Sequence, residues 1–264
     1  AANKYIKVDA MHIVVVGKGT EVAENLKQFG TVTFYDDEGN VTAPPSMPIP
    51  DGITTEGVVN AYIKALGGEK NLKLVKDVAI YYEASIPGAP MKISAVRMKK
   101  RPNKFKMEMS AEGMGTLQKI VFDGKNGSMS GMQGAQDMEG EELEELKSQG
   151  EFFPELNYLT DAYTLNLSHM DKVDGEDAYV MEVTKGDETH TEYYSASTGL
   201  KLKSESVEEG PEGPITVGQI FSDYKEAKGV KFPNTLILEQ GQQIKLTATD
   251  VKVNSGLKDS EFAK

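Results

Sequence analysis

The chain has 264 residues, of which 39% are hydrophobic, so it has enough apolar material for one large domain or two small ones. A formal net charge of −12 at pH 7 makes binding to nucleic acid or to anionic headgroups unfavourable through overall charge. The sequence contains no cysteine, which excludes disulfides and thiolate zinc sites, and it has no apolar stretch near the ~20 residues that a membrane span requires.

The first 38 residues have the pattern of a strand, a helix and a second strand. Met11 to Val16 is an unbroken apolar run, Thr20 to Phe29 has apolar side chains at helical spacing, and Thr31 to Tyr35 alternates like a strand. So short a unit cannot bury enough apolar surface to offset the entropy lost on ordering the chain. We therefore expect residues 1–38 to be the remnant of a larger domain, followed by a proline-rich linker over residues 39–53.

Residues 54–264 are predicted to form a second, α+β domain. Thr54 or Thr55 can cap a helix that ends at Gly67-Gly68, and another helix is predicted from Gly140 to Gln149. Turns as short as Ser197-Thr198-Gly199 indicate antiparallel neighbours, because parallel strands need a crossover of about a dozen residues or more. Short alternating runs divided by turn signals predict strands at Val78 to Ile86, Met91 to Met98, Phe105 to Met109, Leu117 to Phe122, Gly127 to Met132, Tyr163 to Leu167, Ala178 to Thr184, Thr189 to Ser195, Leu200 to Ser206, Ile215 to Tyr224, Thr235 to Glu239 and Ile244 to Val253. The expected fold is an extended antiparallel sheet with a few helices on one face.

A dinucleotide-binding turn is a candidate site in the first segment. Gly17-Lys18-Gly19 follows the first apolar run, and Asp36 and Asp37 close the next strand about twenty residues later, as in that motif. However, Val22 occupies the position of the third glycine, and no further parallel βα units follow. We favour a structural turn and keep a nucleotide-binding enzyme as a third hypothesis.

Metal chemistry has little support in the sequence. The histidines are His12, His169 and His190, and neither H-E-x-x-H nor H-x-x-E-H occurs. His12, inside an apolar run, is interpreted as structural. We therefore predict neither a catalytic residue nor a metal ligand in this chain.

Two charge clusters are interpreted as structural. Residues Asp137 to Asp161 include nine acids against one lysine, which favours a solvated helix face with Leu143 and Leu146 turned inward over a calcium site. Six basic residues and no acid lie from Arg97 to Lys106. This run is interpreted as a hairpin tip whose lysines protect a sheet edge, with a docking site for an acidic partner as the alternative.

The methionines give the candidate binding site. The proposed ligand-binding residues are Met91, Met98, Met107, Met109 and Met129, which fall within one block of predicted strands. Met107 and Met109 share a face because side chains alternate along a strand. An ordinary core explains most of these residues, but methionines on a curved sheet beneath helices also suit a greasy ligand or an extended peptide.

Two resemblances follow from specific phrases of the sequence. The run Met11 to Gly17, with the next helix and Phe29 to Asp36, resembles the last strand, helix and strand of the carboxy-terminal domain in insulinase-type (pitrilysin family) zinc peptidases. That family carries its H-x-x-E-H zinc site in an earlier domain, which is absent here. The remainder is similar to the tail of such peptidases in Bacteroidetes-like bacteria, through the phrases Gly57 to Gly68, Phe221 to Lys225, Gly229 to Pro233 and Asn254 to Lys258.

The phrase Phe221 to Pro233 also resembles outer-membrane lipoprotein-sorting proteins of the LolA and LolB type. Their half-barrel of curved antiparallel strands holds lipid acyl chains beneath helices, and the resemblance implies this fold for residues 54–264. It also implies a periplasmic or cell-envelope location.

The leading functional hypothesis is a non-catalytic carboxy-terminal region of a cell-envelope zinc metallopeptidase, acting as an accessory binding or docking domain. Its partners would be the upstream peptidase domains, and zinc would belong to the missing catalytic domain, so no cofactor is expected in this fragment. The alternative is a hydrophobic-ligand or lipoprotein carrier that acts through the methionine-lined concave sheet, with a lipid, lipoprotein or peptide as ligand and no nucleic acid.

Overall fold

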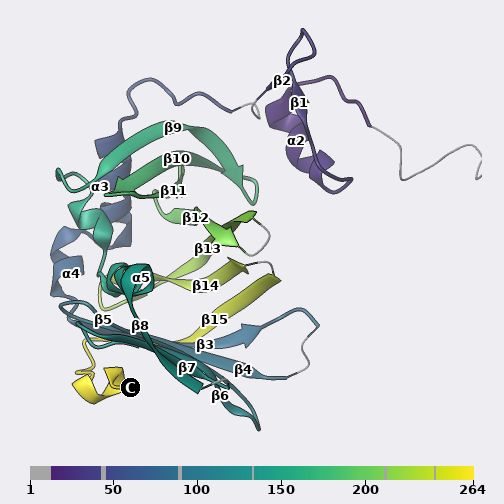
Figure 1. Cartoon of the computed structure of the whole chain (residues 1–264). Helices are drawn as coiled ribbons and strands as arrows, with labels where there is room; N and C mark the ends of the chain where they lie inside the picture. The colour runs from purple at the N-terminus through teal and green to yellow at the C-terminus, as the bar shows by residue number, and fades with distance from the viewer. Residues whose placement is uncertain (1–12, 43–45, 89–90, 133, 211–212, 241) are drawn as a thin grey trace, which may run out of the picture. The chain divides into compact units, whose positions relative to one another are not determined.

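The computed structural model describes residues 13–42, 46–88, 91–132, 134–210, 213–240 and 242–264 (Figure 1). The chain divides into two compact units, Ala1–Pro48 and Ile49–Lys264, which are treated separately below. None of the described helices is both long enough and apolar enough to cross a membrane. His12 lies outside the described residues, so its predicted structural role stays a prediction.

The first unit contains a helix and a small hairpin. The predicted helix is present as α2 (Gly19–Lys27), while β1 (Phe34–Tyr35) pairs antiparallel with β2 (Val41–Thr42). The described part of the predicted first strand, residues 13–16, differs from the prediction because it forms no strand. Its four side chains are 46–97% exposed. A strand needs a neighbour for its backbone groups, and no described residue of this unit supplies one.

The second unit is built on one antiparallel sheet, which has 13 strands within the described residues. The strand order is β8-β7-β6-β5-β4-β3-β15-β14-β13-β12-β11-β10-β9, so two meanders meet where β3 pairs with β15. The strands are β3 (Asp77–Ser85), β4 (Ile93–Lys100), β5 (Lys104–Ala111), β6 (Gly115–Phe122), β7 (Gly127–Gly131), β8 (Gly134–Met138), β9 (Thr164–Val173), β10 (Glu176–Lys185), β11 (Glu188–Ser195), β12 (Lys201–Gly210), β13 (Gly213–Ala227), β14 (Val230–Gln240) and β15 (Gln242–Val253). The predicted antiparallel α+β arrangement is confirmed.

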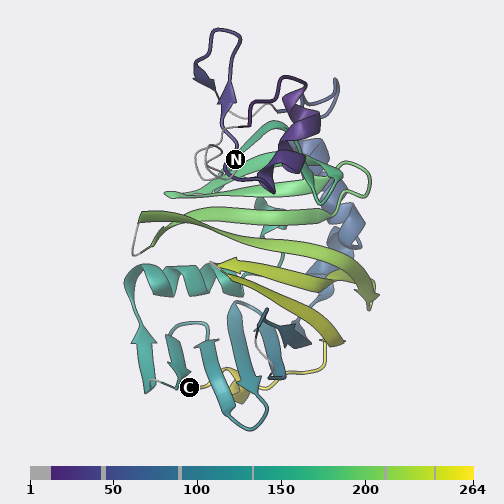
Figure 2. The same ribbon diagram turned by 90° about the vertical axis from the view of Figure 1, so that its right-hand side faces the viewer.

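The sheet curls without closing, because β8 and β9 remain as its two edges (Figures 1 and 2). Register shifts interrupt the ladders at Met109/Ser110, Val180/Met181, Tyr193/Tyr194 and Ala248/Asp250. An extra residue at such a position bends the strand and increases its twist. These bulges therefore contribute to the curvature that gives the sheet a concave face.

The helices of the second unit are α3 (Thr55–Leu66), α4 (Glu69–Leu74), α5 (Gly140–Gly150) and the short 3-10 turns η2 (Pro154–Asn157) and η3 (Asp259–Phe262). The predicted cap of α3 is confirmed, since the Thr54 Oγ1 accepts a hydrogen bond of 3.0 Å from the Gly57 N–H. Gly67, at φ 129°, ends the helix as predicted. The connection from β8 to β9 runs through α5 and η2 and crosses the concave side of the sheet (Figure 1).

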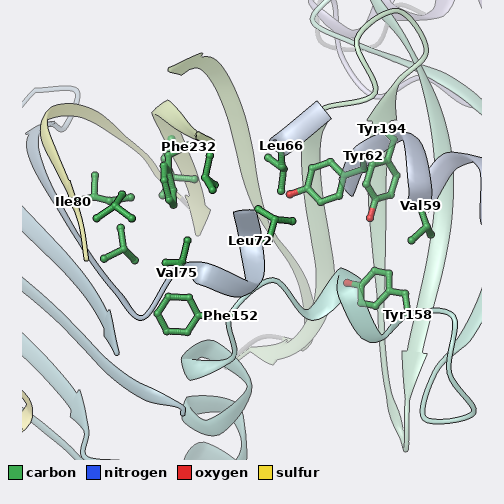
Figure 3. Packing of buried hydrophobic residues seen from close by; sticks show 14 of the residues in the cluster. Val59, Tyr62, Leu66, Leu72, Val75, Ile80, Phe152, Tyr158, Tyr194 and Phe232 are labelled. Carbon is green, nitrogen blue, oxygen red and sulfur yellow. The ribbon is translucent and has the colours of Figure 1, made fainter. Parts of the chain in front are cut away.

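The main core lies between these helices and the concave face. Val59, Tyr62 and Leu66 of α3 are buried against Tyr194 of β11 and Phe232 of β14, among others (Figure 3). A second, smaller cluster lies on the outer face, where Phe262 of η3 covers part of the sheet. The concave face is therefore packed by helices at one end of the strands.

The structure confirms the prediction for the acidic cluster and only part of the prediction for the basic run. Leu146 of α5 is buried against Phe105 and Phe122, while Glu142, Glu144 and Glu145 of the same helix are exposed, so the solvated-face interpretation is confirmed for these residues. The β4–β5 hairpin tip is also as predicted. The edge-protecting role predicted for its lysines is wrong, because β4 and β5 lie inside the sheet between β3 and β6.

The β8 edge strand was not predicted, since its sequence GAQDM has no apolar alternation.

Candidate functional site

Three of the predicted methionines lie on the concave face of the sheet. Met107 and Met109 of β5 are both half-buried and pack against the main core. Ile120 of β6 pairs with Met107 on one side and with Met129 of β7 on the other, which places all three in one cross-strand row. The structure therefore brings Met107, Met109 and Met129 to a common surface.

Met98 and Met91 do not join this surface. Met98 pairs with Ala79 and packs against Ala79 and Phe262 on the outer face of the sheet. Met91 lies in the connection before β4 and is 42% exposed. The sequence places these residues in neighbouring strands, but the face of each is decided by the pairing register, which methionine spacing does not give.

Beyond the cover of the helices, the concave face carries apolar side chains that are only partly buried. They come from strands of both meanders, so they line the curved surface from its two sides. These side chains are Met107, Met109, Leu165, Leu167, Phe221, Leu238 and Ile244. A hollow of about 400 Å³ at the β6–β8 end of the sheet includes Met129 in its lining, together with Gln118 and Gln136. Partly buried apolar surface of this kind is available to a ligand with an apolar body.

A buried group of charges ties η2 to strands β11 and β12. The Lys201 Nζ lies 2.7 Å from Oε1 of Glu155, and it also forms an ion pair with Glu192. Tyr158 donates a hydrogen bond of 3.0 Å to Oε1 of Glu192, and Tyr194 donates to the other oxygen. Sequence reasoning missed this cluster, because its members come from two separate stretches of the chain, 155–158 and 192–201, and belong to no spaced motif.

The electrostatics of this cluster are those of a structural tie. Burial alone would lower the pKa of Lys201, but the adjacent Glu155 and Glu192 carboxylates outweigh it and hold that pKa well above its usual range. Burial alone would raise the pKa of Glu192. Lys201 and His190, whose Nε2 lies 3.3 Å from Oε1 of Glu192, outweigh burial, so that this pKa is lowered. Lys201, Glu155 and Glu192 are each no more than 7% exposed. The ammonium therefore has two carboxylate partners and belongs to a side chain that is largely shielded from solvent.

A second set of cations lies on the concave face of β4. Arg97 pairs with Met107, and Lys99 pairs with Phe105, so both point to the same side as the methionines. The Lys99 Nζ donates a hydrogen bond of 2.7 Å to the main-chain oxygen of Glu151. Burial, with repulsion from Arg97, lowers the pKa of Lys99 to about 7. The predicted basic run is therefore divided between faces, since Lys100 and Lys104 pair with Asp259 on the outer side.

The described residues before Gly17 form no strand, so the strand that leads into the glycine turn of a dinucleotide-binding motif is not found among residues 13–16. Asp36 accepts hydrogen bonds from the main-chain N–H groups of Glu38 (3.0 Å) and Asn40 (2.8 Å), and these bonds shape the β1–β2 hairpin. The hydrogen bond from Asn40 is the main reason that the pKa of Asp36 is lowered. Asp36 therefore has a structural role in this hairpin, and the structural-turn interpretation of Gly17-Lys18-Gly19 stays a prediction. The described residues contain no group of His, Asp and Glu side chains arranged to hold a metal ion.

Taken by itself, the second unit is an unclosed antiparallel half-barrel with helices on its concave side. A DUF1329 family protein from Desulfovibrio piger has a similar structure, with a TM-score of 0.53 and 12% identity, over 79% of this chain and 96% of that chain. A LolA superfamily protein from Nitrosomonas europaea gives a TM-score of 0.51 and 16% identity, over 81% of this chain and 99% of that chain. No protein-family model matches the sequence, and a comparison with curated proteins found no match.

The predicted LolA-like half-barrel fold is therefore confirmed. At these identities the likeness concerns the fold alone. Neither structure relates this chain to a zinc peptidase, so that part of the sequence resemblance stays a prediction.

Proposed function

We propose that the second unit is a carrier for a hydrophobic ligand, which it holds against the concave face of the sheet. The observation that carries this proposal is the set of partly buried apolar side chains on that face, in particular Met107 and Met109. Each buried CH₂ group is worth about 0.8 kcal/mol, so an acyl chain of about fifteen methylenes offers about 12 kcal/mol before the costs of association. Micromolar binding needs only about 8 kcal/mol of net free energy.

The fold supports this proposal as well as a location in the cell envelope. A half-barrel with an open edge on each side can widen around a ligand more easily than a closed barrel, whose strands are all paired. The similar LolA superfamily structure supports the carrier alternative over the accessory role. A lipid or the acyl part of a lipoprotein is the ligand class that fits this surface best.

Titration with a fluorescent fatty acid tests the carrier function. We expect micromolar or tighter binding to the intact chain, and we expect the double variant Met107→Glu/Met109→Glu to weaken it at least about tenfold, because a carboxylate on the apolar surface must be desolvated. Met114→Glu is the matched control, since Met114 lies in the β5–β6 turn and is 52% exposed. If the folded protein shows no binding at about 100 μM probe, its dissociation constant is too weak for a carrier, and the proposal is refuted.

A non-catalytic accessory role in a zinc peptidase is the second candidate. One observation favours it: the side chains of residues 13–16 are 46–97% exposed in the first unit, as expected for a segment that pairs with another domain. The coding sequence upstream of the Ala1 codon tests this role. An H-x-x-E-H motif in a preceding domain would support it, and an upstream region without one would contradict it.

A further inference from the structure

Arg97 is a cation inside the half-barrel that lacks an anion to balance it. The register places it between Ile80 of β3 and Met107 of β5 on the concave face. Its guanidinium carbon lies 5.5 Å from the centroid of the Phe105 ring, and its Nε is enclosed without a hydrogen-bond acceptor. Among the described residues, no carboxylate forms an ion pair with it.

Two other shielded cations on this sheet, Lys201 and Lys106, are balanced by carboxylates. Lys201 has Glu155 and Glu192, and Lys106, on the outer face of β5, has Glu108 at 2.9 Å. A charge removed from water without a partner is strongly unfavourable, and burial accordingly lowers the pKa of Arg97. Guanidinium nevertheless stays protonated in proteins, so the positive charge persists inside the half-barrel.

Lys99 adds a second basic side chain next to Arg97. It lies two residues further along β4 on the same face, and its one hydrogen bond from Nζ goes to a main-chain carbonyl oxygen, not to a carboxylate. The whole chain carries a net charge of −12, so Arg97 and Lys99 form a local basic site in an acidic protein. Met107 and Met109, the apolar surface of the proposed carrier site, are on the adjacent strand.

We propose that Arg97 and Lys99 bind the anionic head group of an amphiphile, a carboxylate or a phosphate, while its acyl chain lies along Met107 and Met109. The two Nη groups of a guanidinium carry four N–H donors in one plane, and this geometry matches the oxygens of either anion. This inference rests on the proposed carrier function and adds the charge class of the ligand to it.

Three probes that share one oleoyl chain test the inference on the full chain: oleate, oleoyl lysophosphatidic acid and neutral monooleoylglycerol. We expect Arg97→Met to weaken binding of at least one anionic probe about tenfold or more, because charge-assisted hydrogen bonds are lost. Binding of the neutral probe should change less than about twofold. A loss confined to oleate identifies a carboxylate ligand, and a loss confined to the lysophosphatidic acid identifies a phosphate ligand.

Lys106→Met is the matched control, because it removes the same charge from the opposite face of the sheet. Lys99→Met is a second test variant and should repeat the Arg97→Met pattern more weakly. The ligand-free Arg97→Met protein should melt no lower than the parent, since an unpaired charge has been removed. Equal changes for all three probes would overturn the inference and leave the carrier function standing, whereas no binding of any probe by the parent protein would overturn both.

Discussion

Replacing Lys201 by methionine should lower the free energy of unfolding by about 3–5 kcal/mol, the usual cost of removing one partner from a buried ion pair. The substitution leaves the Glu155 and Glu192 carboxylates, 6% and 2% exposed, without their counter-ion. Chemical denaturation at pH 7 measures the change. Lys203→Met is the matched control, because Lys203 pairs with Glu205 at a more exposed outer site, where such pairs contribute about 1 kcal/mol or less.

The pH dependence of the free energy of unfolding shows whether the stability lost in Lys201→Met comes from unpaired charge or from lost packing. Without Lys201, burial raises the pKa of the Glu192 carboxyl above its value in the unfolded chain. A group with a raised folded pKa favours the folded state at low pH, so the stability deficit of the variant should shrink as the pH falls from 7 toward about 4.5. A deficit of equal size at both ends of this range would show that the loss comes from packing instead.

Replacing Gly67 by alanine should destabilise the second unit by about 3 kcal/mol. Gly67 has φ 129°, where residues other than glycine are strained, and a Cβ built on it would lie 2.1 Å from the main-chain oxygen of Gly229. That oxygen belongs to the turn between β13 and β14. The end of α3 and this turn must therefore move apart, which opens the main core at Leu66 and Val230.

Thermal unfolding of Gly67→Ala beside Gly175→Ala tests this expectation. Gly175 also has a positive φ, 85°, but its added Cβ would meet no atom within 4 Å, so only backbone strain of about 1–2 kcal/mol applies. A melting temperature for Gly67→Ala equal to that of the control would mean that the contact with Gly229 relaxes at no cost.

Local signals in the sequence were sufficient for most elements of the second unit. Thr54 and Gly67 delimit α3 because capping and a positive φ depend on a few neighbouring residues. Twelve of its strands were predicted from period-two alternation, which is also local. The strand β8 lacks that alternation, so its pattern did not predict it. Residues 13–16 form an unbroken apolar run, which predicted a strand, but no described residue of the first unit pairs with them.

The sequence by itself determined the α+β class, the antiparallel order of neighbours joined by short turns, and the apolar character of the methionine block. Only the tertiary structure decided that Met98 faces away from Met107, that Glu155 and Glu192 share Lys201, and that Arg97 has no anion. The reason is physical: a one-residue change of register moves a side chain to the other face of a sheet, and charges meet across elements whose separation in the chain carries no periodic signal.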